Sequence, residues 1–393
     1  MIQEDHSIPL IATTLYGLEE TLAGELAELG AADVSPENGA VRFKGDKRLM
    51  YRVNLECRTA IRVLYPVAEF PCRDENELYR ETIRVDWSRY LDFEMTMAVD
   101  AVVRKSALNN SMYAAQKCKD AIVDQIRSKT GRRPSVDIAN PALRLNLFIN
   151  ANRAVLSLDS SGESLHRRGY RTEGGKAPLN EILAAGIVKL SGWNGENILI
   201  DPMCGSGTIL IEAALLVSGT APGLIRKSYG FQKWKDYDRE LFKSVFQTLK
   251  TDVKPIGDKL IHGSDKSGMR IDDARANARR AGVGGAIAFS QGRFQNSVAP
   301  ASDGTVIMNP PYGDRIKSAD LKKLYREIGD TLKNNYQGYT AWIFTGNLDA
   351  AKYIGLRTSQ RIKLFNGPIE CRLLKFELYS GSRKLKYRDN EST

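Results

Sequence analysis

The strongest constraint on the fold is a regular alternation of short apolar runs and longer amphipathic stretches in the second half of the chain. The apolar runs lie at residues 198–200, 260–262, 305–308 and 340–344, and stretches with helical periodicity separate them. Strands that alternate with helices at this spacing are typical of a doubly wound parallel sheet. We therefore predict an α/β domain of this kind over residues 166–393.

The first half of the chain has shorter elements that predict two small α+β units. In residues 1–70 a short strand at Ile8–Thr13 precedes an amphipathic helix, and Asp46 is placed to cap a second helix. Residues 71–165 mix helical stretches with paired strands. A stretch rich in Gly, Ser and Arg at residues 161–178 has the composition of a connector. We predict domains at residues 1–70, 71–165 and 166–393.

Charge and cysteine content narrow the classes of partner. Lys and Arg number 57 against 47 for Asp and Glu, so the net charge of +10 favours a polyanionic partner, although a merely basic protein is the simpler alternative. The five cysteines are far apart and form no C-x-x-C pair, which argues against a disulfide framework or a zinc cluster. The N-terminus lacks the order of a signal peptide, and no run reaches the ~20 apolar residues of a membrane span. We expect a cytoplasmic protein that needs no metal.

The first motif with chemical content is the turn D-P-M-C-G-S-G-T at residues 201–208, which lies between an apolar strand and an apolar helix. Glycines at such a turn let a ligand approach the backbone, and the following helix offers free N–H groups. No G-K-[ST] sequence and no third glycine follow, so ATP and NAD are less favoured. Asp201 suits a ligand with a positive charge, such as the ammonium of a methionine group. An ordinary glycine-containing turn is the alternative.

A second carboxylate, Asp265, ends the next predicted strand. At that position in a dinucleotide fold, a carboxylate accepts the ribose hydroxyls of an adenosine. Asp265 lies further along the chain than the ~20 residues of that rule, because a segment at residues 220–254, rich in Lys and aromatic residues, reads as an inserted helical piece. A surface carboxylate is the alternative.

The most specific motif is Asn309-Pro310-Pro311-Tyr312, directly after the strand at residues 305–308. The prolines fix the backbone, so the Asn309 side chain and the Pro310 carbonyl are stiff acceptors at the strand end. Two such acceptors can hold the hydrogens of an exocyclic amine and turn its lone pair toward an electrophile, while Tyr312 stacks on the base. A rigid Pro-Pro turn without a function is the alternative.

Together and in this order, the three motifs resemble those of class I S-adenosylmethionine (SAM)-dependent amino-methyltransferases, which have a Rossmann-like sheet. The N-terminal half looks like a ferredoxin-like unit followed by a THUMP domain. The segments S-L-H-R-R-G-Y-R at residues 164–171 and P-L-N-E-I-L-A-A at residues 178–185 are similar to the THUMP-containing guanine-N2 RNA methyltransferases, in particular those that act on bacterial 23S rRNA. This resemblance covers nearly the whole chain. It implies methyl transfer from SAM to the N2 amine of a guanosine in structured RNA.

The resemblance also assigns roles to residues. It implies that the base is held by Asn309, Pro310, Pro311 and Tyr312. It implies that SAM is held by Asp201, Met203, Cys204, Gly205, Ser206, Gly207, Thr208 and Asp265. The family often has an acidic residue for the adenine amine where this chain has Ser290-Gln291-Gly292-Arg293, and Gln291 is the expected substitute. Basic clusters suited to RNA phosphates comprise Arg132, Arg133, Arg167, Arg168 and Arg171, with a solvated basic face as the alternative.

Other functions share part of this pattern. A tRNA guanine-N2 methyltransferase has the same motifs, and a protein-glutamine or DNA-adenine methyltransferase shares N-P-P-Y but has no need of a basic N-terminal half. A non-catalytic RNA-binding protein has no physical reason to keep both the glycine turn and Asn309. Some bacterial family members carry a second methyltransferase domain, for which this chain ends too soon, so a single methylation is expected. The sequence makes no prediction of the oligomeric state.

Overall fold

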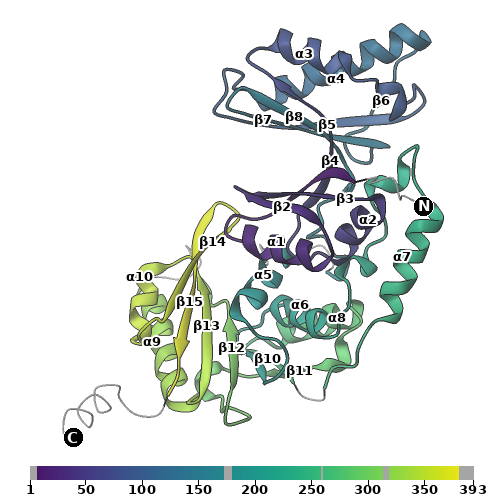
Figure 1. Ribbon diagram of the computed structural model, residues 1–393. Coiled ribbons are helices and arrows are strands. Elements are labelled where there is room, and N and C mark those ends of the chain that lie inside the picture. The colour runs from purple at the N-terminus through teal and green to yellow at the C-terminus, as the bar shows by residue number, and fades with distance from the viewer. Residues whose placement is uncertain (1–6, 172–178, 258–259, 313–317, 380–393) are drawn as a thin grey trace, which may run out of the picture. The chain divides into compact units, whose positions relative to one another are not determined.

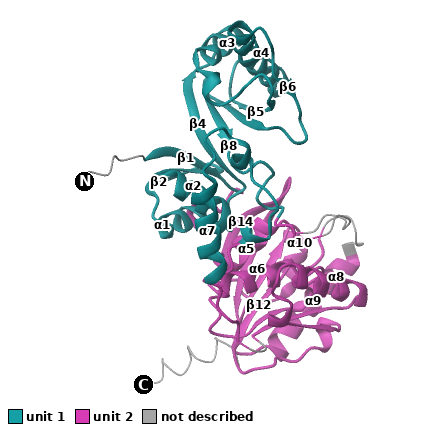
Figure 2. Ribbon diagram, turned by 90° about the vertical axis from the view of Figure 1, so that its right-hand side faces the viewer, with its two compact units in different colours: residues 1–14, 22–167, 222–251 teal, residues 15–21, 168–221, 252–393 magenta. Residues whose placement is uncertain are grey.

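The computed structural model describes residues 7–171, 179–257, 260–312 and 318–379 (Figure 1). Connector residues 172–178, Gly313 after N-P-P-Y and the C-terminal tail at 380–393 lie outside the described residues. The chain forms two compact units, which Figure 2 distinguishes by colour. Unit 1 comprises residues 1–14, 22–167 and 222–251, and unit 2 comprises residues 15–21, 168–221 and 252–393.

Unit 1 is built on one eight-stranded sheet with the order β2-β3-β1-β4-β8-β7-β5-β6. Its strands are β1 (Ile8–Thr13), β2 (Ala32–Glu37), β3 (Ala40–Gly45), β4 (Arg62–Pro71), β5 (Thr96–Arg104), β6 (Ser135–Val136), β7 (Leu143–Asn150) and β8 (Arg153–Asp159). Its helices are α1 (Glu19–Glu28), which begins in unit 2, α2 (Lys47–Glu56), α3 (Glu75–Arg84), α4 (Ser111–Thr130) and α7 (Arg239–Thr251). The ten-residue β4 pairs with β1 at one end and with β8 along most of its length, so the two predicted α+β units share a single sheet.

Local signals in the sequence explain several of these elements. The Asp46 side chain accepts the Leu49 N–H at 2.7 Å and caps α2, as predicted. Strand β2 is a mostly exposed edge strand that contains Pro36, which fits the restriction of proline to sheet edges. The sequence analysis missed β2, because an exposed edge strand has no apolar alternation to reveal it.

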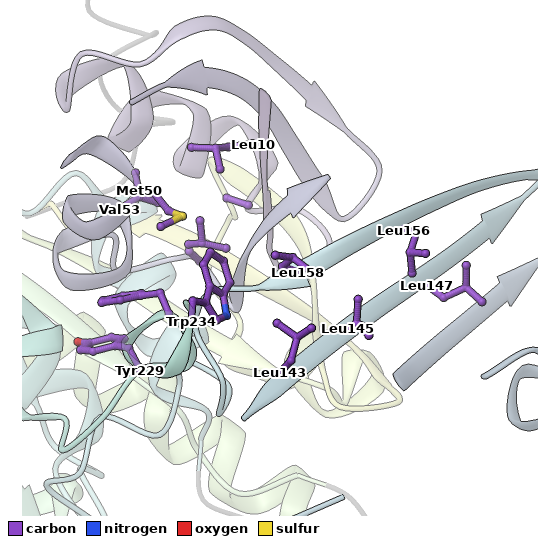
Figure 3. Packing of buried hydrophobic residues seen from close by; sticks show 14 of the residues in the cluster. Leu10, Met50, Val53, Leu143, Leu145, Leu147, Leu156, Leu158, Tyr229 and Trp234 are labelled. Atoms are coloured by element: carbon purple, nitrogen blue, oxygen red, sulfur yellow. The ribbon is translucent and has the colours of Figure 1, made fainter. Parts of the chain in front are cut away.

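The segment at residues 222–251 is an insertion that packs into the core of unit 1. Figure 3 shows its residues Tyr229 and Trp234 among the buried side chains of unit 1, near Met50 and Val53 of α2. The ring of the fully buried Phe231 lies 4.5 Å from that of Tyr51, centroid to centroid. The predicted range 166–393 runs through this insertion, which contributes its aromatic side chains to the N-terminal core instead.

Unit 2 has a seven-stranded sheet with the order β11-β10-β9-β12-β13-β15-β14. Its strands are β9 (Leu199–Asp201), β10 (Ile261–Asp265), β11 (Ile287–Gln291), β12 (Gly304–Met308), β13 (Tyr339–Thr345), β14 (Gln360–Asn366) and β15 (Ile369–Glu377). Its helices include α5 (Glu181–Ser191), α6 (Thr208–Val217), α8 (Gly268–Arg280), α9 (Ser318–Asn335) and the short α10 (Leu348–Ala351). The first five strands in this order are parallel, and β15 pairs antiparallel with both β13 and β14. The predicted doubly wound α/β fold is confirmed.

The insertion generates a prediction about stability. We expect Phe231→Ala to destabilise the protein by about 3–5 kcal/mol, because truncating a fully buried aromatic side chain removes apolar burial and leaves a cavity. Met112→Ala is the matched control, because the Met112 side chain is 74% exposed, and it should change stability by less than about 0.5 kcal/mol. Thermal unfolding of the full chain measures both changes. Equal melting curves for the two variants would contradict the packing of the insertion described here.

Candidate functional site

The turn after β9 has the geometry that its glycines predict. Gly205 and Gly207 have φ values of 54° and 80°, in the left-handed region that glycine adopts without strain. A Cβ on Gly207 would lie 3.1 Å from the Ala274 Cβ and 3.3 Å from the Phe289 ring, so this position packs closely against α8 and β11. A Cβ on Gly205 would meet no atom within 4 Å. The turn therefore leaves open space over Gly205, where a ligand can approach the backbone.

The other residues of the turn are held by neighbouring elements. The Cys204 N–H donates to the Ser264 carbonyl at 3.0 Å, and the Asn277 side chain donates to the Ser206 carbonyl at 3.0 Å. Met203 is half-buried and packs against the apolar cluster of unit 2, whereas Cys204 is buried. Thr208 begins α6 and is also buried. These contacts fix the backbone of the turn.

Asp201 ends β9 and is 2% exposed. Its Oδ1 accepts the Met203 N–H at 3.1 Å, which stabilises the first residues of the turn. The pKa of Asp201 is raised to about 8, mainly by burial; the hydrogen bond from the Met203 N–H lowers it, and the nearby charge of Asp265 raises it. Asp201 is therefore an acid whose proton a nearby positive charge can displace near neutral pH.

Asp265 closes the turn from the neighbouring strand. Its Oδ2 accepts the Gly205 N–H at 3.1 Å, and its Oδ1 accepts the Ser267 N–H at 2.9 Å. Each carboxylate oxygen keeps a second lone pair for a further hydrogen-bond donor. Gln291 ends β11 in register with Asp265, and its side chain donates to the Lys266 carbonyl at 3.2 Å. The structure thus brings the two residues predicted for ribose and adenine side by side at the sheet edge.

Asn309 and Pro310 follow β12, which lies between β9 and β13 in the sheet. Pro310 is buried and Pro311 is exposed. The Asn309 Oδ1 is buried, and it accepts no hydrogen bond from the described residues. A buried acceptor without a donor costs about 1–3 kcal/mol, so it is unusual in a native fold and marks a place where a donor from a ligand would fit.

Tyr312 is held from two sides. Its hydroxyl oxygen accepts the Asn366 side-chain N–H at 2.8 Å, and its ring meets that of Phe344 edge-on at 6.3 Å between centroids. A Cβ on Gly346 would lie 2.9 Å from the Tyr312 ring, so only a glycine at this position leaves enough space for the ring. Burial raises the pKa of the Tyr312 hydroxyl, which stays neutral. The sequence analysis missed Asn366 and Gly346, because they belong to distant segments that carry no motif.

Two of the predicted RNA-binding arginines have buried partners inside unit 2. Arg168 is 2% exposed, and its Nε lies 3.6 Å from Glu212 Oε1, which also accepts the Tyr170 hydroxyl at 3.0 Å. Arg171 donates to Thr208 Oγ1 at 2.5 Å and lies 3.4 Å from Glu181 Oε1. These contacts tie the connector to the start of α6. The burial of Arg168 contradicts its predicted RNA contact, whereas the partly buried Arg171 remains a prediction.

The other three predicted RNA-binding residues are exposed and belong to unit 1. The Arg132 guanidinium lies 5.0 Å from the centroid of the Phe93 ring, and Arg133 follows it in the chain. Arg167 pairs with Glu163 at 3.3 Å, an exposed pair of small energetic value. These three residues stay predictions for RNA contact.

The described residues contain neither a metal-binding group nor a membrane-spanning helix. Within residues 7–171, 179–257, 260–312 and 318–379, no His, Cys, Asp and Glu side chains gather in a group of three or more that could hold a metal ion. All five cysteines are free and buried. In the same described ranges no helix combines the length and the apolar composition needed to cross a membrane.

The residues at the edge of the sheet fit SAM. The space over Gly205 admits a ligand, Asp265 offers acceptors for ribose hydroxyls, and Asp201 offers a negative charge for a cationic ligand. The orphan Asn309 Oδ1 stands at the same edge. Acceptors and a carboxylate of these kinds are what a class I methyltransferase needs at these positions.

Comparison with known families assigns each part of the chain. The family described as "RMKL-like, methyltransferase domain" matches residues 168–375. The family described as "RlmL ferredoxin-like domain" matches residues 9–64, and the THUMP domain family matches residues 72–159.

Similar proteins agree with this assignment. The putative RNA methyltransferase slr0064 of Synechocystis sp. is 43% identical over 94% of this chain and 97% of its own length. The ribosomal RNA large subunit methyltransferase K/L of Syntrophotalea carbinolica is 41% identical over 95% of this chain, which spans about half, 54%, of that relative's length. The crystal structure of the putative methyltransferase SMU.472, complexed with SAH, superposes with a TM-score of 0.86 at 30% identity, over 96% of this chain and 100% of that one. The resemblance read from the motifs is confirmed: the chain belongs to the RMKL-like family of SAM-dependent RNA methyltransferases, with a ferredoxin-like and a THUMP domain ahead of the methyltransferase domain.

Proposed function

We propose that this enzyme methylates the N2 exocyclic amine of a guanosine in structured RNA, with 23S ribosomal RNA as the favoured substrate. The single observation that carries the proposal is the buried, unpartnered Asn309 Oδ1 at the start of N-P-P-Y. An amine that donates one hydrogen there and another to the Pro310 carbonyl satisfies the orphan acceptor. The names of the K/L relatives support ribosomal RNA as the substrate class. Such a substrate would be met in the cytoplasm, as the sequence analysis expects.

When bound, SAM supplies an electrophilic methyl group on a positively charged sulfur. Asn309 and the Pro310 carbonyl position the amine, and their stiffness lowers the entropic cost of bringing nitrogen and carbon into line. Burial and the carboxylates of Asp201 and Asp265 raise the pKa of the Cys204 thiol, so this cysteine stays protonated and is a poor nucleophile. These properties support direct transfer to the amine. The extra amine proton can then leave to water without a strong base.

Tyr312 supports the same proposal as a fixed platform for the target base. Its contacts with Asn366, Phe344 and Gly346 hold the ring in one orientation, so stacking on it costs little conformational entropy. A guanine paired in a helix would have to leave the stack to reach Asn309. We propose that the exposed Arg132, Arg133 and Arg167 contact RNA phosphates during this step.

The direct test of this proposal is the identity of the methylated nucleoside. We expect ribosomal RNA that lacks the modification, incubated with enzyme and SAM, to yield N2-methylguanosine after digestion and mass measurement. Transfer RNA from the same strain, used in parallel, distinguishes the tRNA alternative. N6-methyladenosine would indicate an adenine methyltransferase, and the absence of any methylated nucleoside would support a non-catalytic RNA-binding protein.

Asn309 gives a second prediction. We expect Asn309→Ala to lower kcat by about 100-fold or more, because the amine loses one of its two acceptors, while the Kd of SAM changes less than about twofold. Asn309→Asp keeps an acceptor oxygen at this position and should retain more activity than the alanine variant. Single-turnover kinetics and calorimetric titration with SAM measure the two quantities. Equal losses in rate and SAM affinity would show that Asn309 is a cofactor ligand instead.

Asp201 gives a prediction about protons. Its pKa of about 8 means that it is mostly protonated at pH 7, and a cationic ligand favours the ionised form. We expect SAM binding at pH 7 to release up to one proton and to tighten as the pH rises toward 8. Calorimetry in two buffers of different ionisation enthalpy measures the release. Asp201→Asn should abolish this component, and equal proton release by both proteins would refute the role assigned to Asp201.

A further inference from the structure

A polar cleft of about 370 Å³ lies at the carboxyl edge of the unit 2 sheet. Its walls come from the first turns of α9 and from the segment after β13, which includes α10; Figure 1 shows the two helices next to β13 and β15. The lining residues are Leu321, Lys322, Asn347, Asp349, Ala350, Lys352 and Tyr353. Its volume falls within the range of small-ligand sites.

The cleft lies at the same end of the sheet as Asn309. β12 and β13 are parallel neighbours, so Asn309 and Asn347 follow strands that end at the same edge. Gly346, one residue before Asn347, packs against the Tyr312 ring. Asn347, which lines the cleft, therefore directly follows a residue that contacts the Tyr312 ring.

Two cations share the ring of Tyr353, which lines the cleft: Lys322 is itself a lining residue, and Arg326 lies four residues further along α9, outside the lining. The Lys322 Nζ lies 5.3 Å from the centroid of the Tyr353 ring, and the Arg326 Cζ lies 5.8 Å from it. Among the described residues, neither cation has a carboxylate within ion-pairing distance. Cation–π contacts of this length hold a charge in place without neutralising it. Tyr353 is therefore a positioning residue for two positive charges.

The other lining charges offset these cations only in part. The single lining carboxylate, Asp349, bonds to the Lys352 Nζ at 2.8 Å, and this bond is the main cause of its lowered pKa, to which the charge of Lys322 contributes less. The Asn347 carboxamide oxygen accepts the Ala350 N–H at 2.8 Å, which leaves its NH₂ group as a donor. The cleft thus combines a surplus of positive charge with a neutral hydrogen-bond donor. Such a site suits an anion with several acceptor oxygens.

We propose that this cleft binds the phosphodiester of a nucleotide that flanks the target guanosine in the RNA strand. The proposal rests on the function proposed above. Lys322 and Arg326 contact the phosphate oxygens, Asn347 donates to the same strand, and Tyr353 keeps the two cations in place. A grip on the neighbouring phosphate holds the strand while the target base leaves its stack. The site therefore contributes to the recognition of RNA and not to SAM binding.

The test compares the loss of two cations on α9, Lys322 and Arg326, with the loss of their neighbour Lys323. Lys322→Gln combined with Arg326→Gln removes the two exposed charges on the Tyr353 ring. Lys323→Gln removes the next charge along α9, whose side chain is 76% exposed and is neither in the cleft lining nor one of those two cations. We expect the double variant to raise the KM for 23S ribosomal RNA about tenfold. Its kcat should stay within about twofold, and the Kd of SAM should be unchanged. The Lys323→Gln variant should behave as wild type.

Salt dependence of binding gives a second measurement on the same RNA. The slope of log Kd against log salt should fall by about 0.7 for each phosphate contact that is lost, if the flanking strand is single. Tyr353→Phe keeps the ring and should match wild type, whereas Tyr353→Leu should approach the double variant. Thermal melting identifies any variant that fails to fold.

The outcomes separate this proposal from the proposed function. A double variant with the KM and salt slope of Lys323→Gln overturns the cleft proposal, even when N2-methylguanosine forms. A wild-type enzyme that forms no N2-methylguanosine overturns the proposed function. In that case the salt slope still decides the cleft proposal, because it reports RNA binding without methyl transfer.

Discussion

The parallel pairing of β9 with β10 and with β12 is the constraint on which the candidate site depends. In a parallel sheet the carboxyl ends of all strands lie at the same edge. Residues at these strand ends therefore lie close together in space although they are more than 40 positions apart in the chain. Gly263 stands opposite Asp201 in this register. The bond from the Gly205 N–H to Asp265 then joins the first two strand ends. A shift of register would separate the carboxylate from the glycine turn.

A buried cluster of polar side chains in unit 2 supports the glycine turn after β9. Arg168, Tyr170 and Glu212 lie within hydrogen-bonding or ion-pairing distance in the interior of unit 2. Burying such charges is expensive, and removing one partner of a buried pair is strongly destabilising. The cluster therefore fixes residues 168–170, and the bond from Arg171 to Thr208 links this segment to the first residue of α6. In this chain the arginines of residues 168–171 support the glycine turn.

The sequence was sufficient where local chemistry determines the structure. The glycine turn, the Asp46 cap and the proline-stiffened strand end follow from residue types at fixed spacing. The sequence was insufficient where tertiary contacts determine whether a side chain is buried. Basic composition alone does not distinguish the buried Arg168 from the exposed Arg132. The insertion was predicted as an inserted helical piece without a packing partner, because nothing local reveals that Phe231 fills the core of unit 1.

Two features at the site work against the stability of the fold. Asn309 holds a buried oxygen without a donor, and Asp201 holds a buried carboxyl whose ionisation burial opposes. Each is a local inconsistency of the kind that proteins retain at functional sites and offset elsewhere. A ligand that brings an N–H to Asn309 and a positive charge to Asp201 removes both penalties at once. We therefore propose that the two groups whose burial is unfavourable in the free protein are the ones that favour an amine substrate and a cationic methyl donor.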